Sequence, residues 1–462
     1  MPPSNTKTNE GGLKSLIHKE DWWAVWIGLG IVIVALILVF ARTSLGAINV
    51  SFATFTNFAD VPAQFLVKNP VTGLPMIGTL ILLYAILAAL FTVAMSIMGH
   101  HAGKFLASFT IIFVLAVIIQ LLASWQYLKN VSLEAPVVAL IVGLIIGNFV
   151  KLPEWFENGM RTEFYVKTGI VLMGATLPFT IILQAGPMAL LQASVVAIAT
   201  FLVIYFFGTK LFGLEKPFAA TLGAGGSICG ISASIAIGSA VNAKKEHVSI
   251  SISLVAIWAT IMVLVLPVIA RALGLSDGSA GALIGTSEFA DAAGVAAAAQ
   301  FGDGAMTTFT LMKIVGRDIY VGIWAFVLAI ISAAVWERKK AKNGAATEYT
   351  AQKPFAAIIW QKFPKFVLGF FAASIVVTLI NIWVPDMVSS IDKNALTPLK
   401  NLRTWAFVLC FICIGMTTRF RQLANTGWKP LATFSLGAII NLGLGLLFSA
   451  FLFNSYWTAI GG

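Results

Sequence analysis

Residues 218–242 read FAATLGAGGSICGISASIAIGSAVN, and residues 278–300 read GSAGALIGTSEFADAAGVAAAAQ. Both stretches have apolar flanks around a centre of small and polar residues. The first centre contains four glycines within eight residues: Gly223, Gly225, Gly226 and Gly230. Each glycine weakens a helix by about 1 kcal/mol. We therefore expect the backbone to unwind at the two centres, and this expectation organises the rest of the chain.

Unwound backbone at membrane depth is tolerated only where it is buried in protein or lines a watery cavity. Secondary transporters use such breaks to place helix N-termini and free carbonyl groups around a substrate near the midplane of the membrane. The alternative explanation of the glycines is close helix packing through small residues. Glu288 and Asp291 in the second centre favour the functional interpretation, because acids inside a membrane usually mark ion or proton pathways.

Composition restricts the class of protein. The chain has 462 residues, of which 59% are hydrophobic and 11% charged. Repeated apolar runs of about 20 residues indicate a polytopic helical membrane protein surrounded by lipid. The net charge of +11 lies mostly in short connections between these runs, so it sets orientation and does not indicate a nucleic-acid partner. The three cysteines lie in apolar segments and predict no disulfide framework.

The predicted fold class is an all-α polytopic membrane protein with about eleven transmembrane helices, two re-entrant or broken hairpins and inverted repeats. The expected spans are 22–41, 75–99, 105–125, 135–150, 169–183, 187–208, 248–270, 309–336, 366–384, 403–417 and 429–453. The predicted organisation is a cytoplasmic tail (1–21), three accessory helices (22–128), a transport region (134–336), a basic cytoplasmic linker (337–360) and three C-terminal helices (361–453).

The distribution of lysine and arginine predicts an N-terminus inside the cell and a C-terminus outside. The connections poor in positive charge are 43–74, 126–134, 184–187 and 386–400. Lys244 and Lys245 obey the rule only if residues 218–242 enter the membrane and return to the cytoplasmic side. Two arms of about 10 residues, each about 15 Å long, would reach the midplane. By the same logic, residues 278–300 form a hairpin that enters from the outer side.

A weak internal repeat supports inverted symmetry. Residues 174–190 match residues 415–431 at a constant offset of 241, with Gly, Thr, Phe, Gly and Leu recurring in place. The charge distribution gives the two copies opposite orientations. A weaker match pairs Gly226-Ser227 with Gly285-Thr286. Inverted repeats are the architecture of many secondary transporters.

Three pieces of sequence carry a resemblance to a known family: GGSICGISA at 225–233, GIVLMG at 169–174 and LMKIVGR at 311–317. With these, the chain resembles the family of bacterial membrane transporters named as sulfate exporters, over about residues 135–455. The resemblance implies export of sulfate or sulfonate-like anions. That family usually has a histidine before the acid of its second broken segment, whereas SEFAD at 287–291 lacks the histidine and moves the acids. A different substrate or coupling ion therefore stays open.

The predicted substrate-binding residues come from the two centres and the span that follows. They are Gly225, Gly226, Ser227, Cys229, Gly230, Ser232, Gly285, Thr286, Ser287, Lys313 and Arg317. Serine hydroxyls and helix N-terminal amides can hold an oxyanion, although the serines could instead bond back within a helix, and Cys229 could be a small packing residue. Lys313 and Arg317, four residues apart, share one helix face. They could hold an anion or neutralise the acids, or they could fix two structural elements together. For Arg317, partial pairing with the neighbouring Asp318 is also expected.

Glu288 and Asp291 are the predicted ion-coupling residues. They are three residues apart and share a face if helical. The alternative is a pair of solvated acids at the mouth of the hairpin. H⁺ is the preferred coupling ion and Na⁺ the alternative, because no dense run of oxygen ligands suggests a sodium cage. No cofactor or metal site is predicted.

The predicted function is secondary active transport of a small anion in the bacterial inner membrane by an alternating-access mechanism. The alternatives are an anion channel and, further off, a membrane-embedded enzyme that would use serine, cysteine and glutamate as nucleophile and base. No filter motif supports a channel, and no histidine-based constellation supports an enzyme. A homodimer is one option for the assembly.

Overall fold

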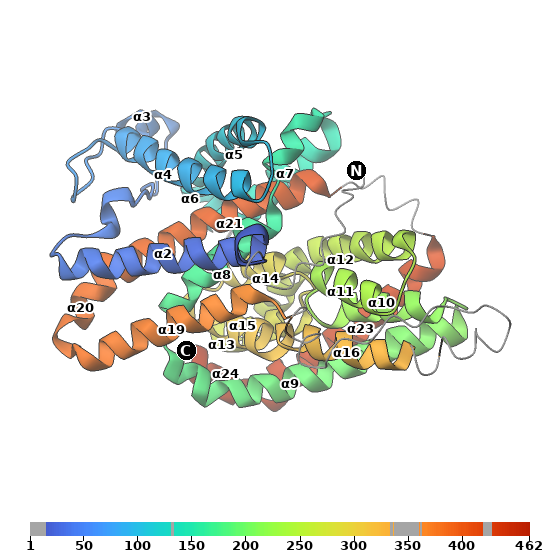
Figure 1. Cartoon of the computed structure of the whole chain (residues 1–462). Coiled ribbons are helices and arrows are strands. Elements are labelled where there is room, and N and C mark those ends of the chain that lie inside the picture. The colour runs from blue at the N-terminus through green and yellow to red at the C-terminus, as the bar shows by residue number, and fades with distance from the viewer. Residues whose placement is uncertain (1–14, 131–133, 333–335, 337–359, 361–362, 419–426) are drawn as a thin grey trace.

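The computed structural model of the chain is built from helices (Figure 1). It describes residues 15–130, 134–332, 336, 360, 363–418 and 427–462, and every regular element within these ranges is a helix. The expected all-α polytopic membrane fold is therefore confirmed. The start of the tail, residues 1–14, and nearly all of the basic linker, residues 337–359, lie outside the described residues.

Nine helices in the described part of the chain are long and apolar enough to cross a membrane. They are α2 (Glu20–Phe40), α4 (Met76–Ile97), α5 (Ala102–Ala123), α9 (Phe179–Phe206) with the π-helical turn η4 (Phe207–Leu211), α12 (Lys245–Ala272), the run α15 (Asp303–Thr310), η5 (Leu311–Asp318) and α16 (Tyr320–Ile331), α19 (Lys365–Trp383), the run Pro385–Thr417 ending in α21 (Thr397–Thr417), and α23 (Trp428–Leu446) with η9 (Leu447–Leu452). Two other expected spans, α7 (Ala135–Phe149) and α8 (Thr162–Thr176), have 15 residues each. They reach about 22 Å, less than the hydrocarbon core of about 30 Å, so the number eleven is not confirmed.

The chain turns between α8 and α9 at Leu177 and Pro178, so the turn predicted at 184–187 is wrong. Leu177 has an extended backbone (φ −111°, ψ 113°), because a residue before proline is sterically pushed out of the helical region. Pro187 lies inside α9 instead of ending a span. Prolines are tolerated in membrane helices where neighbouring groups satisfy the freed carbonyl.

Two further helical segments were not predicted from the sequence. The connection at 386–400 is helical and leads without a loop into α21. After η9 the chain adds α24 (Asn454–Gly461), whose Trp457 is fully buried. The oxygen of Trp457 lies so close to Gly278 that no side chain would fit at that position. The C-terminus is thereby fixed to the beginning of the second broken stretch.

Helix α8 lies at the centre of one half of the fold, with α2, α19 and α21 packed around it. Glycines permit this close approach: Gly174 of α8 meets the backbone at Phe370 of α19, and Gly147 of α7 meets the backbone at Met416 of α21. In Figure 1, α4 and α5 stand at the edge of the molecule, beside α7 and α21. Helix α2 belongs to the packed core, whereas α4 and α5 form a peripheral pair.

Each broken stretch is a hairpin of two short helices. Hairpin 1 consists of α10 (Lys216–Ser227) and α11 (Ile231–Ala240), and hairpin 2 consists of α13 (Asp277–Ser287) and α14 (Asp291–Ala299). In hairpin 1, a Cβ on Gly225 would lie 2.5 Å from Ser234 Oγ, and a Cβ on Gly238 would lie 3.4 Å from Thr221 Cγ2. Contacts placed symmetrically about the break show that the two arms run antiparallel, side by side.

Hairpin 2 also returns to where it began. A Cβ on Gly302, just after α14, would lie 3.9 Å from Asp277 Oδ2 at the start of α13. The run α23–η9 connects the open ends of the two hairpins. Its first residue, Trp428, stacks edge-on against Phe212 beside hairpin 1, and after its end the backbone oxygen of Asn454 accepts a hydrogen bond from Ser279 of hairpin 2 (3.1 Å). The two hairpins therefore enter the fold from opposite ends (Figure 1).

The predicted inversion of the repeat agrees with the packing of α8 on α21. Gly169 faces Phe407. About two turns further along α8, Thr176 accepts a hydrogen bond from Arg403 (3.3 Å). Contacts that advance along α8 thus recede along α21, so the two helices are antiparallel. The second copy of the repeat continues into residues 419–426, which lie outside the described residues.

The opposed hairpins predict the sidedness of two exposed positions. Lys245 lies at the open end of hairpin 1, and Ala459 lies on α24 at the open end of hairpin 2. In a variant whose native Cys229 is replaced by alanine, Lys245→Cys and Ala459→Cys should react with an impermeant thiol reagent from opposite sides of inverted and right-side-out vesicles. Labelling of both from the same side would contradict the arrangement.

Candidate transport site at the meeting point of the hairpins

The tips of the two hairpins touch at the centre of the fold. Hairpin 1 breaks at Ile228–Gly230 and hairpin 2 at Glu288–Ala290. Gly230 has φ +69° and ψ −107°, a conformation that side chains oppose. A Cβ there would lie 2.6 Å from the oxygen of Phe289 and 2.6 Å from Val255 Cγ1. Glycine at position 230 therefore allows both the break and the contact between the tips.

The other three glycines of the first centre stay helical within α10, so the unwinding predicted there is wrong for them. They serve close packing instead. Gly223 faces Phe201 of α9, Gly225 faces Ser234 of α11, and Gly226 faces Ile204 of α9. The penalty of glycine in a helix is offset by the packing of neighbouring helices.

Glu288 stabilises the break of hairpin 2 with its own side chain. Its Oε1 accepts hydrogen bonds from the backbone amides of Phe289 (2.8 Å) and Ala290 (3.2 Å). The residue is fully buried, and its Oε2 has no hydrogen-bond partner among the described residues. These amides would otherwise lack partners at the broken backbone. Glu288 is thus integrated into the tip of the hairpin.

Lys313 and Arg317 hold the ends of α10 and α13 together. The Lys313 ammonium donates to the carbonyl oxygens of Ile228 (3.2 Å) and Glu288 (2.8 Å). Arg317 donates through Nε to the oxygen of Ser227 (3.2 Å). Its Nη1 donates to three carbonyl oxygens of hairpin 2: Gly285 (3.2 Å), Thr286 (2.7 Å) and Glu288 (2.8 Å).

These contacts have a clear electrostatic meaning. The carboxyl end of a helix carries partial negative charge and unpaired carbonyl groups, and a cation there is stabilising. Both basic side chains are fully buried and engage the carboxyl ends of α10 and α13, the first arms of the two hairpins. Their contacts therefore match the expectation that they fix two structural elements together.

The two basic residues are presented by η5, an eight-residue π-helical segment inside the long helix α15–η5–α16. A π-helix bonds residue i to i+5, and such segments are frequent at functional sites. Asp318 ends this segment, fully buried, with neither carboxylate oxygen hydrogen-bonded within the described structure. The predicted local pairing of Arg317 with Asp318 is not observed as a hydrogen bond, since Arg317 donates to backbone carbonyls instead.

A cavity of about 150 Å³ lies beside the tips. One side is formed by the hairpin breaks and the first residues of the second arms, through Cys229 and Ile231 of hairpin 1 and residues 290–293 of hairpin 2. The opposite wall comes from α7, α8, α12 and α21. The first intrahelical hydrogen bonds of α11 and α14 start at Ser234 and Gly294, so the amides before them are free of helical bonds. Two helix N-termini thus open onto one cavity.

The acids at this cavity each lie beside a lysine. Asp291 lies 3.5 Å from Lys313. Glu163 of α8 lies 3.2 Å from Lys167, which also pairs with Asp21 at 2.7 Å. Lys313 lies beside Asp291 at the start of α14, so the partial positive charge of the two helix N-termini is available to an anion.

Comparison with known proteins places the chain in a family. The family described as Conserved hypothetical protein 698 matches residues 107–434. The chain belongs to this family. The matched range begins inside α5 and ends inside α23, so it includes both hairpins, η5 and all walls of the cavity.

Relatives of the family carry the name UPF0324 membrane protein. One from Rhodopirellula baltica is 34% identical over 80% of this chain and 67% of its own length, and one from Nitratidesulfovibrio vulgaris is 33% identical over 83% and 65%. The chain thus spans about two thirds of the length of these two. A relative from Nitrosomonas europaea is 28% identical over 95% of this chain and 97% of its own length. These names give no substrate, and no solved structure matches.

Among the predicted site residues of the chain, Cys229 and Asp291 line the cavity. Gly285 packs against Phe309 and Met312. Ser227 and Ser287 are buried at the ends of α10 and α13, and their hydroxyls have no partner among the described residues. Ser232 lies in the first turn of α11, partly exposed.

Thr286 belongs to a polar network that was not predicted. Its hydroxyl accepts a hydrogen bond from Gln192 of α9 (2.9 Å). The same amide donates to Ser449 (2.7 Å) and accepts from the Trp457 indole (2.8 Å). Gln192 therefore joins α9, hairpin 2, η9 and α24. The sequence contained a signal for this network, because a side-chain amide such as that of Gln192 in an apolar span usually has a specific hydrogen-bond partner.

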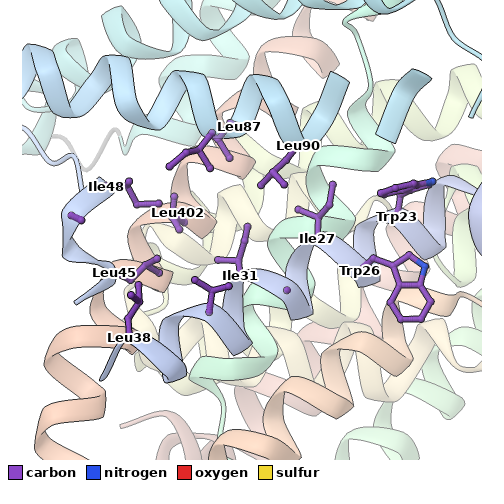
Figure 2. Close-up of a pocket in the computed structure, with 14 residues that line it drawn as sticks. Trp23, Trp26, Ile27, Ile31, Leu38, Leu45, Ile48, Leu87, Leu90 and Leu402 are labelled. Atoms are coloured by element: carbon purple, nitrogen blue, oxygen red, sulfur yellow. The ribbon is translucent and has the colours of Figure 1, made fainter. Parts of the chain in front are cut away.

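A second cavity, of about 490 Å³, lies away from the hairpins between α2, α4 and the short helix η1 (Leu45–Ile48). Figure 2 shows apolar side chains pointing into it, including Ile31 and Leu87, with Trp23 and Trp26 at one end. It contains no charged side chain among its lining residues. A site for a small ion is therefore better assigned to the cavity at the hairpin tips.

Proposed function

We propose that the protein is a secondary transporter that carries a small anion across the bacterial cell membrane by alternating access. The observation that carries the proposal is the paired arrangement of the hairpins. The N-termini of their second arms, α11 and α14, open onto one cavity, whereas the carboxyl ends of α10 and α13 are neutralised by Lys313 and Arg317. Helix N-termini directed at an anionic group are how broken-helix transporters bind such substrates.

The size of the cavity supports a small substrate. Pockets for drug-sized ligands measure about 300–1,000 Å³, and this cavity measures about 150 Å³. A small inorganic or organic anion such as sulfate or a short sulfonate fits this class. Export as the direction, a cytoplasmic N-terminus and an external C-terminus are parts of the proposal that rest on the family resemblance and on the distribution of basic residues.

The position of the cavity supports alternating access. The hairpin tips form one side of the cavity, and α7, α8, α12 and α21 form the other. A shift of one group relative to the other would open the cavity to either side of the membrane, as in other transporters with broken helices.

The contacts of the two predicted coupling acids favour Asp291 over Glu288 for ion coupling. Asp291 lines the cavity, whereas Glu288 bonds to the backbone of its own hairpin. Asp291→Asn should therefore abolish the dependence of anion flux on the pH gradient and keep anion binding, and Glu288→Gln should mainly lower thermal stability. Flux driven by an imposed pH gradient in proteoliposomes measures the first effect, and unfolding in detergent measures the second. Unchanged pH-driven flux in Asp291→Asn would remove this residue from coupling.

Transport itself is tested with purified protein in proteoliposomes and radiolabelled sulfate or a small sulfonate. Saturable flux that follows an imposed ion gradient is the expected result. Unsaturated conductance would show a channel, and conversion of the added compound would show an enzyme. Empty liposomes and liposomes with the Gly230→Ala variant are the controls.

A further inference from the structure

Asp318 is the third carboxyl group in the neighbourhood of Lys313 and Arg317. It is fully buried, and neither of its oxygens has a hydrogen-bond partner among the described residues. Asp291 has Lys313 at 3.5 Å, and Glu288 has two backbone amides. A buried carboxylate without such partners is strongly unfavourable in its charged form.

The π-helical segment determines where Asp318 lies. In an α-helix, residues five apart point to different sides. In η5 the bonding pattern runs from i to i+5, so Lys313 and Asp318 lie one turn apart on the same side of the helix. Lys313 therefore lies beside the carboxyl group of Asp291 in hairpin 2 and has a second carboxyl group, that of Asp318, on its own helix.

Charge balance points to a missing proton. The charged group at the hairpin tips contains the cations Lys313 and Arg317 and the carboxyl groups of Glu288, Asp291 and Asp318. With every group ionised, the negative charges exceed the positive by one. One bound proton makes the group neutral. Asp318 has no hydrogen-bond donor among the described residues to stabilise its charged form, so protonation is most favourable at this carboxyl group.

We propose that Asp318 is the proton-binding group of the carrier, and that Lys313 exchanges between Asp291 and Asp318 during the transport cycle. The inference rests on the proposed function. In the conformation described here, Lys313 pairs with Asp291 and Asp318 holds the proton. When the cavity reopens to the other side, Lys313 moves to Asp318, which releases its proton to water on that side. The proton is taken up again from the opposite side when Lys313 returns to Asp291.

The surroundings of Asp318 restrict which other groups could take this role. Hairpin 1 contributes Cys229, hairpin 2 contributes Glu288 and Asp291, and η5 contributes Lys313 and Arg317. Helix α8 contributes Glu163, which is occupied by Lys167. Helix α9 packs along η5 and carries Tyr205 as its one titratable side chain. Asp318 alone among the three central carboxyl groups has neither a cation within ion-pair distance nor an amide donor in the described structure.

Infrared difference spectroscopy of the purified protein tests this without any transport. On raising the pH, the wild-type protein should show loss of one protonated-carboxyl band. Asp318→Asn should abolish that band, and Asp318→Glu should shift it. A band unchanged in Asp318→Asn overturns the inference. Asp318→Glu keeps the test informative if the asparagine variant fails to fold.

A second readout separates this inference from the proposed function. In proteoliposomes loaded with the anion, Asp318→Asn should keep exchange of internal for external anion. The flux driven by a pH gradient should fall at least tenfold below that of the wild-type protein. If the wild-type protein moves no anion, the proposed function fails. If the wild-type protein is driven by the pH gradient and Asp318→Asn is driven equally well, the function stands and Asp318 is not the proton-binding group.

Discussion

Replacing Arg317 with leucine is expected to destabilise the protein by about 3–5 kcal/mol and to abolish anion flux. The guanidinium group donates hydrogen bonds to four carbonyl oxygens at the carboxyl ends of α10 and α13. Each acceptor left buried without a donor costs about 1–3 kcal/mol, and the contributions are not additive. Thermal and denaturant unfolding of the purified variant in detergent measures the loss.

Arg317→Lys is the matched variant for this prediction. Lysine keeps the positive charge but not the planar fork that reaches several carbonyls at once. We expect an intermediate loss of stability, with flux reduced but measurable. If Arg317→Leu unfolded like the wild-type protein but bound anions more weakly, Arg317 would belong to the substrate site and not to the junction of the hairpins.

Gly230→Ala is expected to abolish transport and to lower stability by more than the strain of its backbone conformation alone. Residues held in such conformations cost about 1–3 kcal/mol. The new methyl group would also lie 2.6 Å from the oxygen of Phe289 and 2.6 Å from Val255. Both neighbours belong to packed elements, so the tips of the hairpins would have to separate. Flux in proteoliposomes and unfolding in detergent measure the two effects.

Gly213→Ala is the control for backbone strain. Gly213 has nearly the same φ, +68°, but is exposed between η4 and α10, with no atom near the position of an added Cβ. The Gly213→Ala variant should lose about 1–2 kcal/mol of stability through backbone strain and should retain anion flux. Equal behaviour of the two variants would mean that contact between the hairpin tips is unimportant.

The class of the fold could be read from the sequence because membrane spans and glycine-rich interruptions have strong local signals. The hairpin of residues 218–242 was expected from the charges of Lys244 and Lys245, and the two arms do lie side by side. The exact place of the break was missed. Glycine permits both unwinding and close packing, and only tertiary contacts decide that Gly230 unwinds whereas Gly226 packs against Ile204.

The chemistry of the site was only partly accessible from the sequence. Lys313 and Arg317 were recognised as important, but their targets are backbone carbonyls, which leave no trace in a sequence. The position of Asp318 depends on π-helical geometry that composition does not reveal. The cavity wall comes from α7, α8 and α21, which are distant in the chain from the hairpins, so Glu163 and Thr417 could not be assigned to it.

The most direct test asks whether an anion occupies the cavity at the hairpin tips. Cys229 lines this cavity and is 6% exposed, whereas Cys410 and Cys413 have no exposed surface, do not line the cavity and serve as internal controls. The rate of Cys229 modification by methyl methanethiosulfonate is measured by mass spectrometry with and without each anion found to be transported. We expect a transported anion to slow the reaction at Cys229 at least fivefold and to leave the two other cysteines unmodified. A rate at Cys229 that no transported anion changes would show that the anion binds somewhere else.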